Sequence, residues 1–317
     1  MDTQEVKDAL KQLVAGCTDI KIYFVDEEDE IKDSGLDGPA LDGCRKEFCA
    51  SLEQKYIENE GFTSPLLSNH DERKHALYRF DFDDQPSEFG WLADAIELTK
   101  SGSVDAFQVE DNKLSNIKAI IIVLENSDGA QAAFYQHVYS VSLLNSDRGM
   151  LNLTAHETRV IKLEQDVLKI GANFVFMTLN DQILVENVKA LESQLNFKKI
   201  IHERANRYTE QLHEMDLVDG LDKFAGKVVE ETAFARKFVK VFNESAVIEA
   251  GVSNEQLIEY AKSKDYYTGS LEYNEEGDKF KLDNAKRCRA FLELLDDDLL
   301  TSSLTNRDYI ARSKDRL

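Results

Sequence analysis

The sequence predicts a mixed α/β (α+β) protein, with a small N-terminal α/β unit, a mostly antiparallel sheet, and a helical C-terminal part. In residues 174–186, two β-favouring runs flank Asn180-Asp181, a polar pair that tolerates positive φ, as in a hairpin turn. Apolar residues repeat at helical spacing after residue 188. All three prolines precede residue 87, so no proline interrupts helices in the remainder.

We expect an acidic α/β domain over residues 1–115, closed by a boundary near residues 100–116. This part holds 27 acidic and 12 basic residues. Apolar spacing and alternation predict its elements in order: a helix over 6–14, a strand over 20–24, a helix over 41–56, a strand over 77–82 and a helix over 91–99.

We expect a second domain over residues 116–317, with hairpins over 118–186, helices over 188–295 and a C-terminal tail. β-Branched residues on successive positions of 120–124 are typical of a strand that is buried on both faces. The segment 157–170 fits a strand or a helix. The helical predictions are 188–195, 201–215, one long helix over 217–242, 255–262, and 284–295 with Asp283 as its N-cap.

The composition indicates a globular protein of the reducing cytoplasm. The four cysteines, at positions 17, 44, 49 and 288, form no Cys-x-x-Cys pair, and no N-terminal signal peptide is recognisable. The longest purely apolar run, 119–124, is far shorter than the roughly 20 residues of a membrane helix. We therefore expect contact with a membrane only through a partner.

Catalytic motifs are absent from the sequence, which predicts a protein that is not an enzyme and needs no cofactor or metal. There is no phosphate-binding Gly-Lys loop, no Gly-x-Ser-x-Gly and no His-Glu-x-x-His, and the six histidines are not paired as ligands. The acidic run 26–30 is typical of a solvated loop.

A metal-dependent nuclease is one alternative. Carboxylates near a lysine can hold Mg²⁺ and stabilise a developing anion. The residues that could do so are Glu157, Glu164, Asp166 and Lys169.

Basic residues gather in the helical part, against an acidic background. A net charge of −22 argues against an ordinary nucleic-acid binder unless the cations are segregated. Residues 196–240 hold nine basic and eight acidic residues. A groove of these cations would bind the DNA backbone without reading sequence. The candidate DNA-binding residues are Lys198, Lys199, Arg204, Arg207, Lys223, Lys227, Arg236, Lys237 and Lys240.

A second alternative is a protein–protein adaptor that never touches DNA. The dense negative charge of residues 1–115 suits docking on a basic partner surface.

Two stretches resemble the KwaB subunit family of the bacterial Kiwa anti-phage defence system. They are NDQILVENVKALESQLNFKKIIHERA, residues 180–205, and LLDDDLLTSSLTNRDYIARSKDRL, at the C-terminus. The resemblance covers about residues 115–317 and, more loosely, the N-terminal part. It carries no catalytic motif.

The resemblance implies a cytoplasmic protein that is recruited to the inner membrane by a membrane-embedded, KwaA-like partner. It also implies binding to phage DNA and suppression of phage replication and transcription. We therefore predict a non-catalytic, sequence-independent DNA-binding effector, dimeric, which acts by occlusion. Reversal of Lys198, Lys199, Arg204 and Arg207 to Glu is expected to abolish DNA binding.

Overall fold

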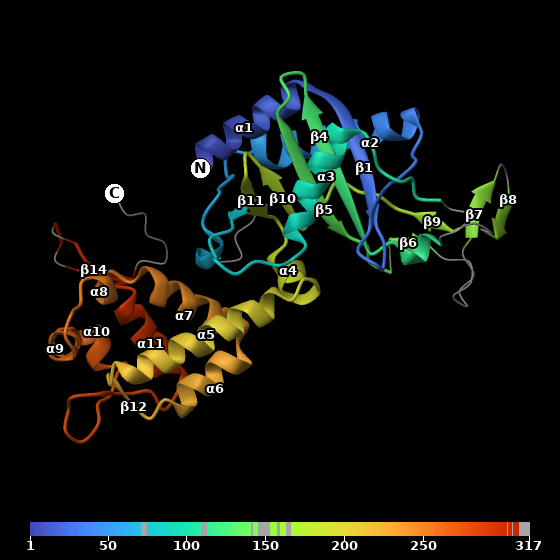
Figure 1. Ribbon diagram of the computed structural model, residues 1–317. Helices are drawn as coiled ribbons and strands as arrows, with labels where there is room; N and C mark the ends of the chain where they lie inside the picture. The colour runs from blue at the N-terminus through green and yellow to red at the C-terminus, as the bar shows by residue number, and fades with distance from the viewer. Residues whose placement is uncertain are drawn as a thin grey trace. The chain divides into compact units, whose positions relative to one another are not determined.

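The computed structural model describes two compact units, Met1–Leu195 (unit 1) and Asn196–Leu317 (unit 2) (Figure 1). The described residues are 1–70, 75–108, 113–140, 142–144, 153–156, 159–162, 166–302, 304–305 and 307–310. Strand β1 (Cys17–Val25) pairs with β4 (Ala119–Asn126), so strands from either side of the expected boundary near residue 116 share one sheet. The division into compact units therefore falls after Leu195 instead.

Unit 1 is built on a seven-stranded sheet of order β2-β1-β4-β5-β10-β11-β3, in which every pairing is antiparallel. Its remaining strands are β2 (Ile31–Asp33), β3 (Tyr78–Arg79), β5 (Gln131–His137), β10 (Phe176–Leu179) and β11 (Gln182–Val185). Two small ribbons accompany the sheet: β6 (Leu143–Leu144) with β9 (Val167–Leu168), and β7 (Leu153–His156) with β8 (Arg159–Lys162).

The predicted hairpin is confirmed as β10 and β11. Leu179 lies opposite Gln182, so Asn180 and Asp181 form the two-residue loop. Both have positive φ, 49° and 61°, which matches the right-handed twist of the flanking strands.

Helices cover both faces of this sheet (Figure 1). On one face, α1 (Thr3–Ala15) and α2 (Gly38–Leu52) pack Leu10 and Phe48 against alternate strand residues such as Ile122. Strand β4 is buried at seven of its eight positions, as predicted for a strand with both faces covered. The unit therefore has an apolar layer on each side of the sheet.

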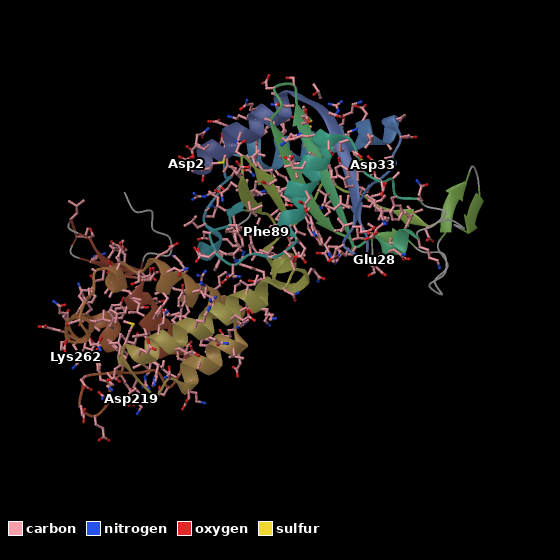
Figure 2. The ribbon with its side chains drawn as sticks, viewed as in Figure 1. Asp2, Glu28, Asp33, Phe89, Asp219 and Lys262 are labelled. Atoms are coloured by element: carbon pink, nitrogen blue, oxygen red, sulfur yellow. The ribbon has the colours of Figure 1, made fainter. Side chains whose placement is uncertain are left out.

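The opposite face packs against α3 (Phe89–Ser101). Phe89, labelled in Figure 2, lies 4.6 Å from the Phe176 ring, and Tyr135 stacks on Phe176 from the neighbouring strand at 4.7 Å. The Tyr23 hydroxyl is 2.9 Å from Thr99 Oγ1. Unit 1 also contains α4 (Val188–Gln194), a short π-helix (Glu53–Ile57) and two 3₁₀ helices (Leu67–Asn69 and Leu114–Asn116).

Unit 2 is helical. Its helices are α5 (Phe197–Glu214), α6 (Asp222–Glu230), α7 (Thr232–Glu244), α8 (Ala246–Glu249), α9 (Asn254–Ser263), α10 (Asp265–Thr268) and α11 (Ala285–Leu295). Unit 2 also contains two short β-ribbons: β12 (Val218–Asp219) pairs with β13 (Phe280–Lys281), and β14 (Leu299–Thr301) pairs with β15 (Asp308–Ile310). Phe224 lies at the centre of its core, 5.2 Å from Phe234 and 4.9 Å from Phe238 between ring centroids.

Two helical predictions in unit 2 are wrong. The long helix over 217–242 is β12 followed by α6 and α7, which are separated by Glu231 in an extended conformation with φ −116° and ψ 99°. The N-cap of α11 is Asn284, whose Oδ1 accepts a hydrogen bond from Arg287 N at 3.0 Å, instead of Asp283. The segment 157–170, left open between strand and helix, contains β8 and β9 in its described part.

None of the helices in the described part of the chain is both long enough and apolar enough to cross a membrane.

Candidate nucleic-acid interface

Helix α5 carries the first four candidate residues, but on different sides. Its buried stripe consists of Phe197, Ile201, Ala205 and Leu212. At 100° per residue, Lys199 and Arg207 lie on the exposed side opposite this stripe. Lys198 and Arg204 lie on opposite flanks, and the Arg204 guanidinium is half-buried over the Tyr208 ring, 5.8 Å from its centroid.

Acidic residues alternate with the exposed cations of α5. Lys199 Nζ lies 3.7 Å from Glu203 Oε1, one turn along the helix. Glu210 and Glu214 are exposed in the following turns. This side of α5 therefore presents charges of both signs rather than a continuous basic stripe.

Helix α6 carries two of the candidate lysines, and they differ in their exposure to solvent. Lys223 is exposed in the first turn and forms no ion pair with any described residue. Lys227 is only 7% exposed, because its ammonium group pairs with the Glu231 carboxylate and lies 5.0 Å from the centroid of the Phe234 ring. Of these two candidate DNA-binding residues, only Lys223 is therefore exposed to a ligand in solution.

Helix α7 carries three of the candidate cations, and its two lysines contact carboxylates that follow α11. Arg236 is 7% exposed. Lys237 Nζ donates to Asp298 Oδ2 at 3.1 Å, and Lys240 Nζ lies 3.6 Å from Asp296 Oδ2. Asp298 is itself 4% exposed, so the first pair is partly removed from solvent. These contacts connect α7 with the end of α11.

A cavity of about 290 Å³ lies where α6 meets the start of α11, and both Lys223 and Lys227 line it. Glu230 and Glu231 line it as well, together with Asn284. The cavity therefore does not concentrate positive charge.

His202 lies on the Lys198 flank of α5. Its Nε2 is 3.2 Å from Thr232 Oγ1. Burial lowers the pKa of His202, and the Lys198 charge acts in the same direction, whereas the interaction of the imidazole N–H with the backbone carbonyl of Val228 opposes both effects. The imidazole is therefore neutral at physiological pH and adds no positive charge to this flank.

The metal-site alternative falls partly outside the described residues. Glu157 and Glu164 are not described. Asp166 precedes β9, and the backbone N–H of Lys169 donates to Ser142 O at 2.8 Å. Within the described ranges, no three His, Cys, Asp or Glu side chains are grouped so that they could hold a metal ion.

The acidic run of unit 1 is anchored by its first residue. Asp26 is 3% exposed, and its Oδ1 accepts from Glu28 N at 3.1 Å and from Glu30 N at 2.9 Å. Lys32 Nζ donates to Asp26 Oδ2 at 2.6 Å. Residues 27–30 are exposed around the Asp26 carboxylate, and Glu28 is labelled at this loop in Figure 2. The run is a structured turn with a solvated outer surface.

Sequence reasoning missed the carboxylates that pair with the α7 lysines. Asp296 and Asp298 lie in the run LLDDDLL, 56 and 61 positions after their partners. No local pattern connects residues so far apart in the sequence. Only the packing of α11 beside α7 brings them together.

The fold and the charged helical surface define a two-unit α/β protein whose helical unit holds all nine candidate DNA-binding cations. The family described as "Kiwa protein KwaB-like" matches residues 114–305. Kiwa protein KwaB of Escherichia coli O55:H7 (strain RM12579 / EPEC) is 30% identical over 321 residues, which cover 100% of this chain and 99% of that protein. The chain therefore belongs to the KwaB-like family, and the resemblance in the sequence is confirmed. No solved structure gives a significant match.

Proposed function

We propose that this chain is a non-catalytic anti-phage defence protein that holds DNA through its phosphates and so blocks replication and transcription of phage DNA. Membership of the KwaB-like family supports the defence role. The observation that carries the DNA-binding part is the set of exposed cations in unit 2: Lys198, Lys199, Arg207 and Lys223.

These four are preferred among the nine candidates because their side chains reach solvent. Lys198 and Lys223 form no ion pair with any described residue. A phosphate would therefore add an interaction to them without displacing a carboxylate. The other five candidates are half-buried or buried, and Lys227, Lys237 and Lys240 already have carboxylate partners.

The spacing on α5 suits duplex DNA. Lys199 and Arg207 are eight residues apart on one side, which corresponds to about 12 Å along the helix axis. The major groove is about as wide. The two side chains can therefore reach backbone phosphates on either side of one groove, without contact to the base edges that would give sequence preference.

Four phosphate contacts predict weak and salt-sensitive binding. The logarithm of the association constant should fall with the logarithm of salt concentration with a slope of about −3 to −4. Raising the salt from 50 to 200 mM should then lower affinity roughly a hundredfold. A homodimer would present the four cations twice, which would make the loss of affinity with salt steeper.

We propose that a KwaA-like membrane partner recruits such a dimer to the cytoplasmic face of the inner membrane.

A gel-shift titration of the full chain with phage DNA tests the proposal. The quadruple variant K198E/K199E/R207E/K223E should lose the shift. The matched control K11E/K46E/K100E/K189E makes the same change in net charge on four exposed lysines of unit 1 and should retain it. Equal loss in both variants would mean that overall charge, rather than this surface, governs binding.

Adding Mg²⁺ to the same titration distinguishes the nuclease alternative from occlusion. Intact, slowly migrating DNA supports occlusion. Fragments that disappear on Asp166→Ala would instead assign metal-dependent cleavage.

An adaptor function is the second candidate, and the charge of unit 1 favours it. Unit 1 holds 36 acidic and 18 basic residues. A surface of that sign attracts a basic partner over a distance set by ionic strength. Absence of any shift by the wild-type chain at low salt would support the adaptor and contradict DNA binding.

A further inference from the structure

Three side chains of unit 1 that the proposed function does not use meet where β1 begins. Cys17 is the first residue of β1, at an irregularity of the β1–β4 pairing. Arg45 and Cys49 are four residues apart on α2 and therefore lie one above the other on the same side of that helix. Arg45 Nη1 donates to the Cys17 carbonyl oxygen at 2.9 Å, which places the start of β1 beside the side of α2 that carries Cys49.

The cluster is held in place and is open to small molecules. Arg45 Nη2 also donates to Asp42 Oδ1 at 2.6 Å, which fixes the guanidinium between α2 and β1. Cys17 and Cys49 are both half-buried, whereas Cys288 in unit 2 is fully buried. Cys44 is five residues before Cys49, so it lies about 140° away around α2.

We propose that Cys17 and Cys49 form an oxidisable dithiol, which a hydroperoxide converts into a disulfide within unit 1. Cys17 is the attacking residue and Cys49 the resolving one. The inference is independent of DNA binding, because neither cysteine belongs to the candidate interface.

The electrostatics assign these two roles. The pKa of Cys17 is lowered to about 7, chiefly because the Cys49 thiol donates a hydrogen bond to its sulfur, with a further contribution from the Arg45 charge. Burial and the Asp19 carboxylate oppose this effect. The pKa of Cys49 is raised, first by the bond that it supplies, then by burial, with the Glu53 carboxylate adding to both. Cys17 is thus the thiolate near neutral pH.

The reaction balances without any other reactant. The Cys17 thiolate attacks one peroxide oxygen, the O–O bond breaks, and the departing oxygen leaves as an alcohol, or as water from hydrogen peroxide, after taking up a proton. Cys17 is then a sulfenic acid. The Cys49 sulfur attacks the Cys17 sulfur, the S–O bond breaks, and the hydroxide leaves as water with the Cys49 proton. Two thiols are oxidised to one disulfide, and one hydroperoxide is reduced.

Peptide mapping of the full-length wild-type chain tests this pairing without any substitution. After reduction and brief exposure to a small excess of hydrogen peroxide, the intact mass should fall by two hydrogen atoms. The digest should contain a peptide in which Cys17 is joined to Cys49, and a thiol reductant should remove it. A chain that forms no such peptide, or one that joins Cys44 instead, would overturn the proposal.

Single variants separate the two roles. Cys49→Ser should stop at a sulfenic acid on Cys17 that dimedone traps, and Cys17→Ser should not form the disulfide. Cys44→Ser, the matched control on the same helix, should react as the wild type does. Dimedone labelling at Cys49 instead of Cys17 would reverse the assignment and contradict it.

The pH dependence of alkylation gives an independent readout. Modification of Cys17 by iodoacetamide should follow a titration with its midpoint near pH 7. Because nucleophilicity falls with pKa, the rate at pH 7 should exceed that of an ordinary thiol only about threefold. A midpoint near the ordinary thiol value of about 8.5 would show that the hydrogen bond from Cys49 does not stabilise the thiolate.

Discussion

The two units differ in how they use charged side chains. Unit 1 holds twice as many acidic as basic residues, 36 against 18, and leaves most of the Asp26–Glu30 run on its surface. Unit 2 is close to balanced, with 24 acidic and 20 basic residues. It buries Lys227 and Arg236 and pairs several other cations with carboxylates.

This comparison shows that the density of cations in a sequence segment does not measure the positive charge that a ligand meets. A lysine whose ammonium group already contacts a carboxylate has little to gain from a phosphate, because the new contact must replace the old one. In unit 2, Lys198 and Lys223 are exposed and form no ion pair with a described residue, whereas Lys237 and Lys240 of α7 contact carboxylates that follow α11. In unit 1 the surplus acids have too few basic neighbours to be neutralised.

Truncation of a buried aromatic residue gives the largest expected effect and tests whether the units are independent. Phe134 in unit 1 and Phe238 in unit 2 are both fully buried. Either Phe→Ala substitution should lower the free energy of unfolding of its own unit by about 3–5 kcal/mol, because it removes buried contacts and leaves a cavity. Differential scanning calorimetry should show each variant shifting a different transition. A common shift of a single transition in both variants would show that the chain unfolds as one cooperative block.

The next largest effect on stability is expected at Lys227 of α6, and the exposed Lys223 on the same helix provides the comparison. Lys227→Ala should destabilise unit 2 by about 1–3 kcal/mol, since it removes the packing of a buried side chain on Phe234 and its contact with the Glu231 carboxylate. Lys223→Ala is the matched control and should change stability by less than about 0.5 kcal/mol. Urea unfolding measures both. Equal stabilities would contradict a structural role for Lys227, whereas DNA affinity should respond to the control substitution alone.

In unit 1 a comparable effect is expected at Asp26. Burial opposes ionisation of this carboxyl, but the hydrogen bond from Lys32 and those from the backbone outweigh it and hold the pKa below its usual value. Because the folded-state pKa is depressed, ionised Asp26 contributes stability above its unfolded pKa of about 3.9, and this is lost as pH falls through the folded value.

Asp26→Asn should therefore cost about 1–3 kcal/mol at pH 7 and less in strong acid, where the wild type has lost the same contribution. Urea unfolding at the two pH values measures the difference. Glu27→Gln, at an exposed position of the same turn, should have little effect at either pH. A pH-independent cost at Asp26 would mean that the shape of the turn matters and not its charge.

The smallest effect is expected at the β10–β11 turn. Asp181→Gly should stabilise unit 1 by about 0.5–1 kcal/mol, because the left-handed conformation at φ 61° costs a residue with a side chain more than it costs glycine. Thermal unfolding of unit 1 should shift upward while that of unit 2 stays unchanged. A downward shift would show that the Asp181 side chain makes a contribution that outweighs the conformational cost.

Local patterns accounted for much of unit 1. The strand at residues 20–24, the buried strand at 120–124 and the hairpin at 174–186 are all present, because alternation and turn chemistry act within a few residues. The break between α6 and α7 was not predictable in the same way. The apolar stripe of Phe224, Val228 and Ala235 continues across Glu231 with little change of phase, so the pattern does not reveal that the backbone becomes extended there.

The sequence by itself determined the mixed fold class, the hairpin and its turn, the helical character of the second half, and the family. The tertiary structure decided which strands share the sheet, where the compact units divide, and which cations remain exposed. The physical reason is the distance along the sequence over which each kind of interaction acts. Propensity, periodicity and turn preference are properties of neighbouring residues, whereas an ion pair such as Lys237–Asp298, or the hydrogen bond from Arg45 to the Cys17 carbonyl, forms only when packing joins distant segments.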